Sequence, residues 1–197
     1  MKIDINADVG EGIGNEQQLM QYLTSCSIAC GGHSGDEASM RNVLKLAKAN
    51  NVKVGAHPSF PDRLNFGRLN MDISNKDLFS TLLHQIDTLN KFAAQEGLAL
   101  NHVKPHGALY NIAAKDLPMA QVVIAVIQRL ETDVILYAPY ESVIANLALE
   151  QGVEVRYEGF ADRSYTANRS LVARSETNAI LSDCQHVLTH VMNMVKY

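Results

Sequence analysis

The stretch Leu98-Ala-Leu-Asn-His102-Val-Lys104-Pro-His106-Gly107 contains the pattern that decides the fold. Its first six residues predict a buried β-strand over 98–103, and a polar turn with two histidines and a lysine follows at once. A helix is expected a few residues later at Asp116-Leu-Pro, because Asp is a good N-cap and Pro fits the first helical turn. One unit of the chain is therefore a strand, a polar loop and a helix.

This unit recurs along the whole sequence. Alternation of strands and helices indicates a parallel sheet, since successive parallel strands need a helical crossover. Five of the loops that follow strands are rich in polar residues, which favours a nearly closed β/α barrel over an open doubly wound sheet with one crevice. The expected strands are 2–6, 27–30, 52–56, 98–103, 134–138 and 153–157, and the expected helices are 16–24, 36–50, one from Ser74, one from Asp116, 141–151 and 176–195.

Composition narrows the class of protein. The chain has 197 residues, of which 47% are hydrophobic and 19% charged, so we expect one folded domain over 1–197. A net charge of −4, with no run of Lys or Arg, argues against nucleic acid. No apolar stretch reaches the ~18 residues of a membrane span, and Asp4 is too early for a signal peptide. Three cysteines, an odd number, suggest the reducing cytoplasm.

The first loop carries alternating polar residues. Asp4, Asn6 and Asp8 fall on one face of an extended chain. If that face points into a barrel, its carboxylates need a paired charge or a cation, so a functional role is favoured. The alternative is that Asp4 or Asp8 only caps the glycine loop. Gly10-x-Gly12 is not a dinucleotide fingerprint, because residue 15 is Asn, and the chain has no P-loop sequence.

The next two loops have their own chemistry. His33 comes just before a helix, where free amides suit an anionic group, and Asp36 is expected to be that helix's N-cap. In the loop after residue 57, prolines stiffen the chain and Arg63 and Arg68 could clamp a carboxylate. The alternative is an ion pair between Asp62 and one of these arginines that only fixes the loop.

The fourth and sixth strands end in further polar residues. Alternation places His102, Lys104 and His106 on one side, and a lysine among histidines has the chemistry of an acid, a base or an electrostatic clamp. After the sixth strand, either Asp162 or Arg163 is expected to face a substrate while the other holds the loop. Residues interpreted as structural are Cys26, Cys30 and His84. His186 and His190 have the spacing of a metal pair, but a solvated helix face is expected for them.

Taken together, the motifs resemble those of the LamB/YcsF family, in the same order over residues 4 to 165. The matching segments are Asp4 to Glu11, Ser25 to Asp36, Gly55 to Asp62, Phe66 to Arg68, His102 to Asn111 and Phe160 to Tyr165. The resemblance implies a seven-stranded β/α (TIM-like) barrel of the glycoside hydrolase/deacetylase type. It also implies lactam utilization, in which 5-oxoproline is opened to L-glutamate with ATP hydrolysis.

The sequence departs from the family pattern at several places. Ser27, Gly32 and Arg169 replace residues that relatives usually have as Asn, Phe and Gly. Family members also continue with one more strand and helix, so the expected barrel lacks its last β/α unit and exposes two strand edges. We expect either that such edges favour a homo-oligomer or that the chain is poorly active.

The resemblance implies a cosubstrate and partners, and the positions of the polar residues suggest their roles. ATP is the expected cosubstrate, and two partner subunits, of B and C type, are expected to complete the enzyme. The expected catalytic residues are Asp8, His57, Lys104, His106 and Asp162, and the expected substrate-binding residues are Asn6, His33, Arg68, Tyr110 and Arg163.

Two alternatives remain at this point. One is a metal-dependent hydrolase or deacetylase, in which Asp8, His33 and His57 bind a divalent ion and His106 is the acid. The other is a non-catalytic subunit that binds substrate while its partners carry the chemistry.

Overall fold

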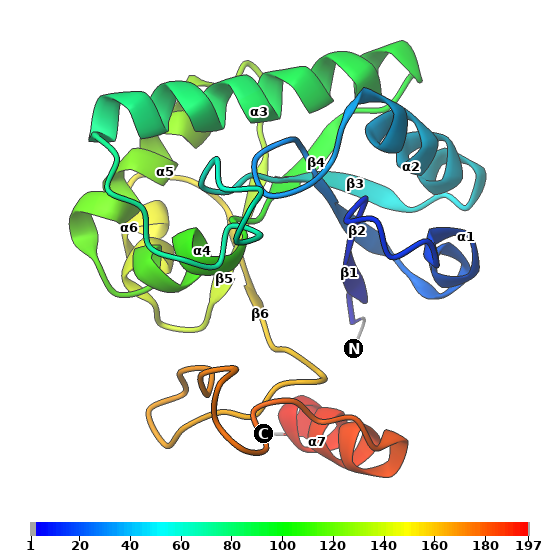
Figure 1. Ribbon diagram of the computed structural model, residues 1–197, viewed down its shortest axis with the longest axis vertical. Coiled ribbons are helices and arrows are strands. Elements are labelled where there is room, and N and C mark those ends of the chain that lie inside the picture. The colour runs from blue at the N-terminus through cyan, green and yellow to red at the C-terminus, as the bar shows by residue number, and fades with distance from the viewer. Residues whose placement is uncertain (1–2, 197) are drawn as a thin grey trace. The chain divides into compact units, whose positions relative to one another are not determined.

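The computed structural model describes residues 3–196, and its centre is a six-stranded sheet curled into a half-barrel (Figure 1). The strands lie in sequence order and run parallel, as the alternating pattern predicts. They are β1 (Asn6–Val9), β2 (Ser25–Ala29), β3 (Lys53–His57), β4 (Leu100–Val103), β5 (Ile135–Pro139) and β6 (Val155–Glu158).

Helices cover the outer face of the sheet, with α2, α3, α5 and α6 following one another around it (Figure 1). The helices are α1 (Glu16–Leu19), followed directly by the 3-10 turn η1 (Met20–Tyr22), α2 (Glu37–Ala49), α3 (Asn75–Gln95), α4 (Gly107–Ala113), α5 (Leu117–Arg129), α6 (Val143–Glu150) and α7 (Cys184–Lys196). Asp36 is the N-cap of α2, as expected: it accepts a hydrogen bond from the amide of Ser39, whose hydroxyl lies 2.8 Å from the Asp36 amide.

The two faces of the sheet differ in chemistry. Alternate residues of β1 to β5 turn outward and join the hydrophobic core with the helices, among them Val9, Ile28, Val54, Val103 and Leu136. Several of the residues between them are polar and contact one another on the inner face, among them Asn6, Ser27 and His102. The inner face of the half-barrel is therefore the place where chemistry is possible.

Some element boundaries differ from the expected ones. The first strand begins at Asn6 rather than residue 2, and Lys2 lies outside the described residues. The last helix begins at Cys184, eight residues later than expected, because 176–183 form turns and bridges. Helix α4 was not expected, because the sequence around Gly107 is typical of a loop. In the structure, Gly107 begins the helix with a φ of +57°.

The chain falls into two compact units, residues 1–156 and 157–197, and the division lies within β6. The expectation of one domain over 1–197 remains a prediction. Each unit is described by itself below.

Within residues 3–196, no single helix is long and apolar enough to cross a membrane. Helices α4 and α5 pass that test only as a pair, by length and composition, with a bend of 112° between them.

A glycine is required at position 55 of β3, because the ring of His102 occupies the space where a larger side chain would lie. A Cβ atom there would lie 2.3 Å from two atoms of the His102 ring on the neighbouring strand. We expect Gly55→Ala to lower the free energy of unfolding by about 1–2 kcal/mol, the usual cost of overpacking. Urea denaturation measures this change. The cost should shrink in a His102→Ala background, and an equal cost in both backgrounds would contradict the explanation.

Candidate functional site

The candidate site lies at the carboxyl ends of β1 to β4, where four loops meet. Parallel strands place these ends on one edge of the sheet, the edge that carries the chemistry in β/α barrels. Asp8 and His57 come from the ends of β1 and β3, whereas His33 and Lys104 follow β2 and β4. The convergence predicted from the loop pattern is confirmed for these residues of the first unit.

A buried ion pair joins the first and fourth strands. Nζ of Lys104 lies 2.8 Å from Oδ1 of Asp8, and Nε2 of His57 lies 3.3 Å from Oδ2 of the same carboxylate. Burial by itself would raise the pKa of Asp8, but the positive charges of His57 and Lys104 outweigh it and hold this pKa well below its usual value. Asp8 is therefore a carboxylate at neutral pH, held against a lysine that is only 5% exposed.

Three histidine rings pack together beside this pair. The rings of His33 and His106 are stacked, with centroids 3.6 Å apart, and His57 meets His106 edge-on at 4.8 Å. All three side chains are buried. Burial lowers the pKa of His33, and burial together with the neighbouring charge of His57 lowers that of His106 to about 2. His33 and His106 are therefore neutral at neutral pH.

Glu11 is the site residue that sequence reasoning missed. Its Oε1 lies 3.1 Å from Nε2 of His33, 3.5 Å from Nδ1 of His106 and 3.9 Å from Nε2 of His57. One ligand atom from each of these four residues lies within 4.8 Å of the others, so they could hold a metal ion. The sequence suggested Asp8, His33 and His57 as ligands. The cluster in the structure keeps His33 and His57, adds Glu11 and His106, and leaves out Asp8. The sequence offered one indication of Glu11: it lies in the same motif as Asp8, three residues further on.

Below this cluster, toward the amino ends of the strands, lies a layer of hydrogen-bonded polar residues. Asn6 donates to the Ser25 hydroxyl at 2.8 Å and accepts from the Ser27 hydroxyl at 3.0 Å, and Nε2 of His102 lies 3.1 Å from the same Ser27 oxygen. The carboxylate of Asp4 accepts from hydroxyls rather than capping the glycine loop, including those of Ser25 at 3.0 Å and Tyr137 at 2.5 Å. The inward face predicted for β1 is confirmed, and Asn6 is bound within this layer.

The loop between β3 and α3 covers the histidines with an aromatic ring. Phe66 contacts both His33 and His106 edge-on, and its carbonyl lies 3.0 Å from Nε2 of His106. Arg68 is exposed, and its guanidinium carbon lies 4.9 Å from the centroid of the Phe66 ring. Asp62 accepts hydrogen bonds from Asn65, so this turn, rather than a pair with an arginine, organises the loop.

Three further residues were expected at the site. Tyr110 is buried in α4. Asp162 and Arg163 belong to the second unit, where Asp162 is exposed and Arg163 is buried. The guanidinium of Arg163 donates to the carbonyl groups of Val172 at 2.6 Å and Ala179 at 3.3 Å. Arg163 therefore holds a loop, which is one of the two roles expected for Asp162 and Arg163.

Residues interpreted as structural keep that role. Cys26 and Cys30 are buried free thiols, and burial raises the pKa of each to about 12. His84 and His186 are exposed on α3 and α7. His190 differs from the expected solvated face, because it is half-buried with its ring 6.0 Å from that of Tyr165.

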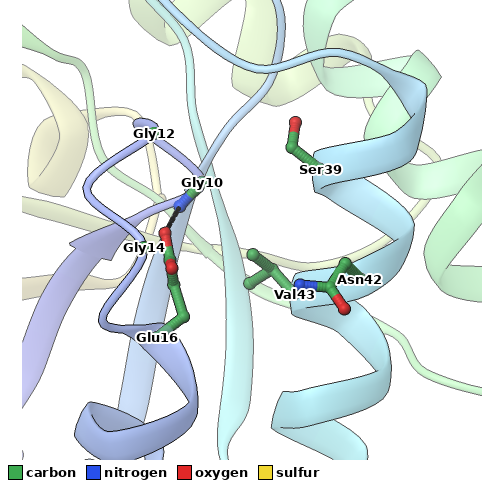
Figure 2. A pocket seen from close by; sticks show the side chains of 7 residues that line it. All are labelled: Gly10, Gly12, Gly14, Glu16, Ser39, Asn42 and Val43. Carbon is green, nitrogen blue, oxygen red and sulfur yellow. Dashed lines mark hydrogen bonds between the residues drawn. The ribbon is translucent and has the colours of Figure 1, made fainter.

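A separate small cavity lies between the glycine loop and α2. Its volume is about 180 Å³, and Figure 2 shows the Glu16 side chain directed toward the loop from below. Glu16 accepts a hydrogen bond from the amide of Gly10, and its negative charge would repel a phosphate group. The glycines therefore do not form a phosphate cradle, as the missing fingerprint suggests. The lining residues are Gly10, Gly12, Gly14, Glu16, Ser39, Asn42 and Val43.

The half-barrel and the polar cluster at the carboxyl ends of its strands define an α/β barrel protein of the glycoside hydrolase/deacetylase type. A solved structure from Enterococcus faecalis V583 has this fold, with a TM-score of 0.56 at 14% identity over 98% of this chain and 74% of that one. The chain itself belongs to the LamB/YcsF family, which matches residues 3–197.

Similar proteins within the family match the chain from end to end. The A subunit of the 5-oxoprolinase from Pyrococcus abyssi is 42% identical over all of this chain and 79% of its own length. The A subunit of the 5-oxoprolinase from Staphylococcus aureus strain JH9 is 40% identical over all of this chain and 80% of its own length. The crystal structure of a lactam utilization protein from Thermus thermophilus has a TM-score of 0.93 at 34% identity, over all of this chain and 81% of that one.

Proposed function

We propose that this chain is the A subunit of a 5-oxoprolinase, which opens the lactam ring of 5-oxoproline to L-glutamate with hydrolysis of ATP. The observation that carries the proposal is the end-to-end similarity, at 40–42% identity, to proteins named as the A subunit of 5-oxoprolinase. The site is consistent with it, because it lies at the edge where barrel proteins bind small substrates.

The reaction needs the groups that meet at this edge. A five-membered lactam is a stable amide, so ATP is required to drive its opening. Transfer of the terminal phosphoryl group of ATP to the amide oxygen releases ADP and makes the ring carbon electrophilic. Water then attacks this carbon while a base accepts its proton, and the C–N bond breaks as the ring nitrogen takes up a proton. Hydrolysis of the acyl phosphate that remains releases phosphate and glutamate. The protein must supply a cation for the oxygen, a base for the water and a positive group for the substrate carboxylate.

The proposed roles follow from position. Lys104 stabilises negative charge at the amide oxygen or the phosphoryl group, and Asp8 holds the lysine in place. One of Asp8, His57 and His106 accepts the proton of the water; Nε2 of His57 lies 3.3 Å from the Asp8 carboxylate and 2.9 Å from Nδ1 of His106. Arg68 is proposed to bind the substrate carboxylate, since it is exposed beside the cluster.

The other assignments stay within the proposal. Asn6, Tyr110 and Arg163 are proposed to bind substrate, and Asp162 is proposed to be catalytic. ATP is the cosubstrate, and two further subunits complete the enzyme. The three free cysteines suit a reducing compartment such as the cytoplasm.

Reconstitution tests this function directly. The full chain is mixed with the B- and C-type subunits, 5-oxoproline and ATP, and glutamate and ADP are measured together. We expect both products in equal amounts, and only when all subunits are present. Binding of 5-oxoproline by the isolated chain, measured by calorimetry, tests the substrate-binding role. Glutamate formation that does not depend on this chain would refute the proposal.

The second candidate is a metal-dependent hydrolase or deacetylase, and the cluster of Glu11, His33, His57 and His106 favours it. Such an enzyme would hydrolyse small amides without ATP, and chelators would stop it. Amide hydrolysis by the purified chain in the absence of ATP and partner subunits distinguishes this candidate from the first.

A further inference from the structure

The hydrogen bonds around two of the histidines fix the position of their protons. Nδ1 of His57 lies 2.7 Å from the carbonyl oxygen of Lys104, and Nε2 of His106 lies 3.0 Å from that of Phe66. A carbonyl oxygen can only accept a hydrogen bond, so both of these nitrogens carry a hydrogen. The other ring nitrogens, Nε2 of His57 and Nδ1 of His106, are therefore the ones left to bind a further group.

These two nitrogens lie close to each other and to a carboxylate. Nε2 of His57 and Nδ1 of His106 are 2.9 Å apart, and Oε1 of Glu11 lies 3.9 Å and 3.5 Å from them. Three such atoms come this close in a buried site only around a shared cation, which is either a proton or a metal ion. The distances among the three atoms indicate which of the two fits.

The spacing of the three atoms matches a metal ion. A point equidistant from them lies about 2.0 Å from each, which is the length of a bond from zinc to nitrogen or to a carboxylate oxygen. Two histidines and one glutamate are also a ligand set of catalytic zinc sites, in which a fourth position stays open. Imidazole ligands favour zinc and similar transition metals over magnesium or calcium.

His33 has a different part in this arrangement. Its ring is stacked on that of His106 with an angle of 5° between the planes, so an ion in the plane of His106 lies out of the plane of His33. Nε2 of His33 is 3.1 Å from Oε1 of Glu11, and its Nδ1 is 3.0 Å from the Ser59 hydroxyl. His33 is thereby placed to hold the carboxylate that faces the ion, as outer residues of metal sites commonly do.

We propose that Glu11, His57 and His106 bind one divalent transition-metal ion, with zinc the best match, and that His33 is a positioning residue for Glu11. The ligand set differs from the trio of Asp8, His33 and His57 suggested by the sequence. Asp8 is paired with Lys104 instead, and lies 3.3 Å from Nε2 of His57 at the margin of the site. The proposal does not depend on 5-oxoprolinase activity, because its test measures binding.

The test uses the full chain after removal of metal with a chelator. Isothermal titration with Zn²⁺ should show one ion bound per chain, and titration with Co²⁺ should produce visible absorption bands of a site with histidine ligands. Mg²⁺ should give neither signal. Absence of zinc binding by the folded wild-type chain would overturn the proposal, and would mean that a proton is shared between His57 and His106 instead.

Variants locate the ion. Glu11→Gln and His106→Asn should each weaken Zn²⁺ binding by at least about 100-fold, and His33→Gln by about 10- to 100-fold, the usual effect of an outer residue. His84→Asn, an exposed histidine on α3, is the matched control and should bind as tightly as the wild type. Circular dichroism confirms that each variant is folded. Unchanged affinity in folded Glu11→Gln and His106→Asn would place the ion elsewhere and refute the assignment.

Discussion

Lys104→Met is expected to lower the rate of ATP-dependent glutamate formation in the reconstituted enzyme by about 10²- to 10³-fold. The reason is that a buried ammonium group is lost from the position proposed to face developing negative charge, and one such donor has an effect of this size. The loss should fall mainly on kcat, because the charge develops in the transition state. Initial rates at saturating 5-oxoproline and ATP measure it.

A matched control separates this effect from a general loss of positive charge. Lys91 is exposed on α3, so Lys91→Met should keep the wild-type rate. Removing Lys104 also leaves Asp8 without its 2.8 Å partner, so the thermal unfolding of each variant must be recorded beside the kinetics. A folded Lys104→Met variant with full activity would exclude the proposed role.

The site could be located from the sequence because it depends on topology. His33, His57 and Lys104 are far apart in the chain, but each comes at or just after the end of a strand. In a parallel sheet these positions must share one edge, whatever the side chains do. The inward direction of Asp4, Asn6 and Asp8 could be predicted for the same reason, since alternation along a strand is fixed by backbone geometry.

The features that escaped prediction depend on loop conformation. Glu11 follows Gly10, whose φ is +75°, and no periodic rule gives the direction of a side chain beyond such a turn. Phe66 was quoted only as part of a motif, yet its ring and its carbonyl both contact His106. Helix α4 was missed because it begins at Gly107, and a glycine directly after a proline and a histidine is typical of a loop.

The two polar layers inside the half-barrel differ in charge. The upper layer holds the Asp8–Lys104 pair and Glu11, whereas the lower one is built mainly of hydroxyl, amide and imidazole groups around His102. Burial, and then the charge of nearby Lys104, lowers the pKa of His102 from 6.5 to about 3. His102 is thus kept neutral, stacked 4.0 Å from Tyr137 and fitted over Gly55.

Stability should therefore depend on pH through His102. The unfolded chain takes up a proton on this ring near pH 6.5, but the folded chain does so only near pH 3. Because the unfolded state binds more protons between these values, its share of the equilibrium grows as the pH falls. The contribution of His102 to stability is complete above pH 6.5 and is lost below it, at up to about 1.4 kcal/mol per pH unit.

His102→Gln removes the titrating group but keeps a polar side chain that can reach Ser27. Between pH 6 and pH 4.5, we expect the wild type to lose about 2 kcal/mol more of its free energy of unfolding than this variant does. Urea denaturation at a series of pH values measures the difference, and the other buried histidines cancel because both proteins contain them. His84→Gln, at an exposed position of α3, should follow the wild-type curve. Parallel curves for wild type and His102→Gln would show that His102 is protonated in the folded chain, which would contradict a neutral His102.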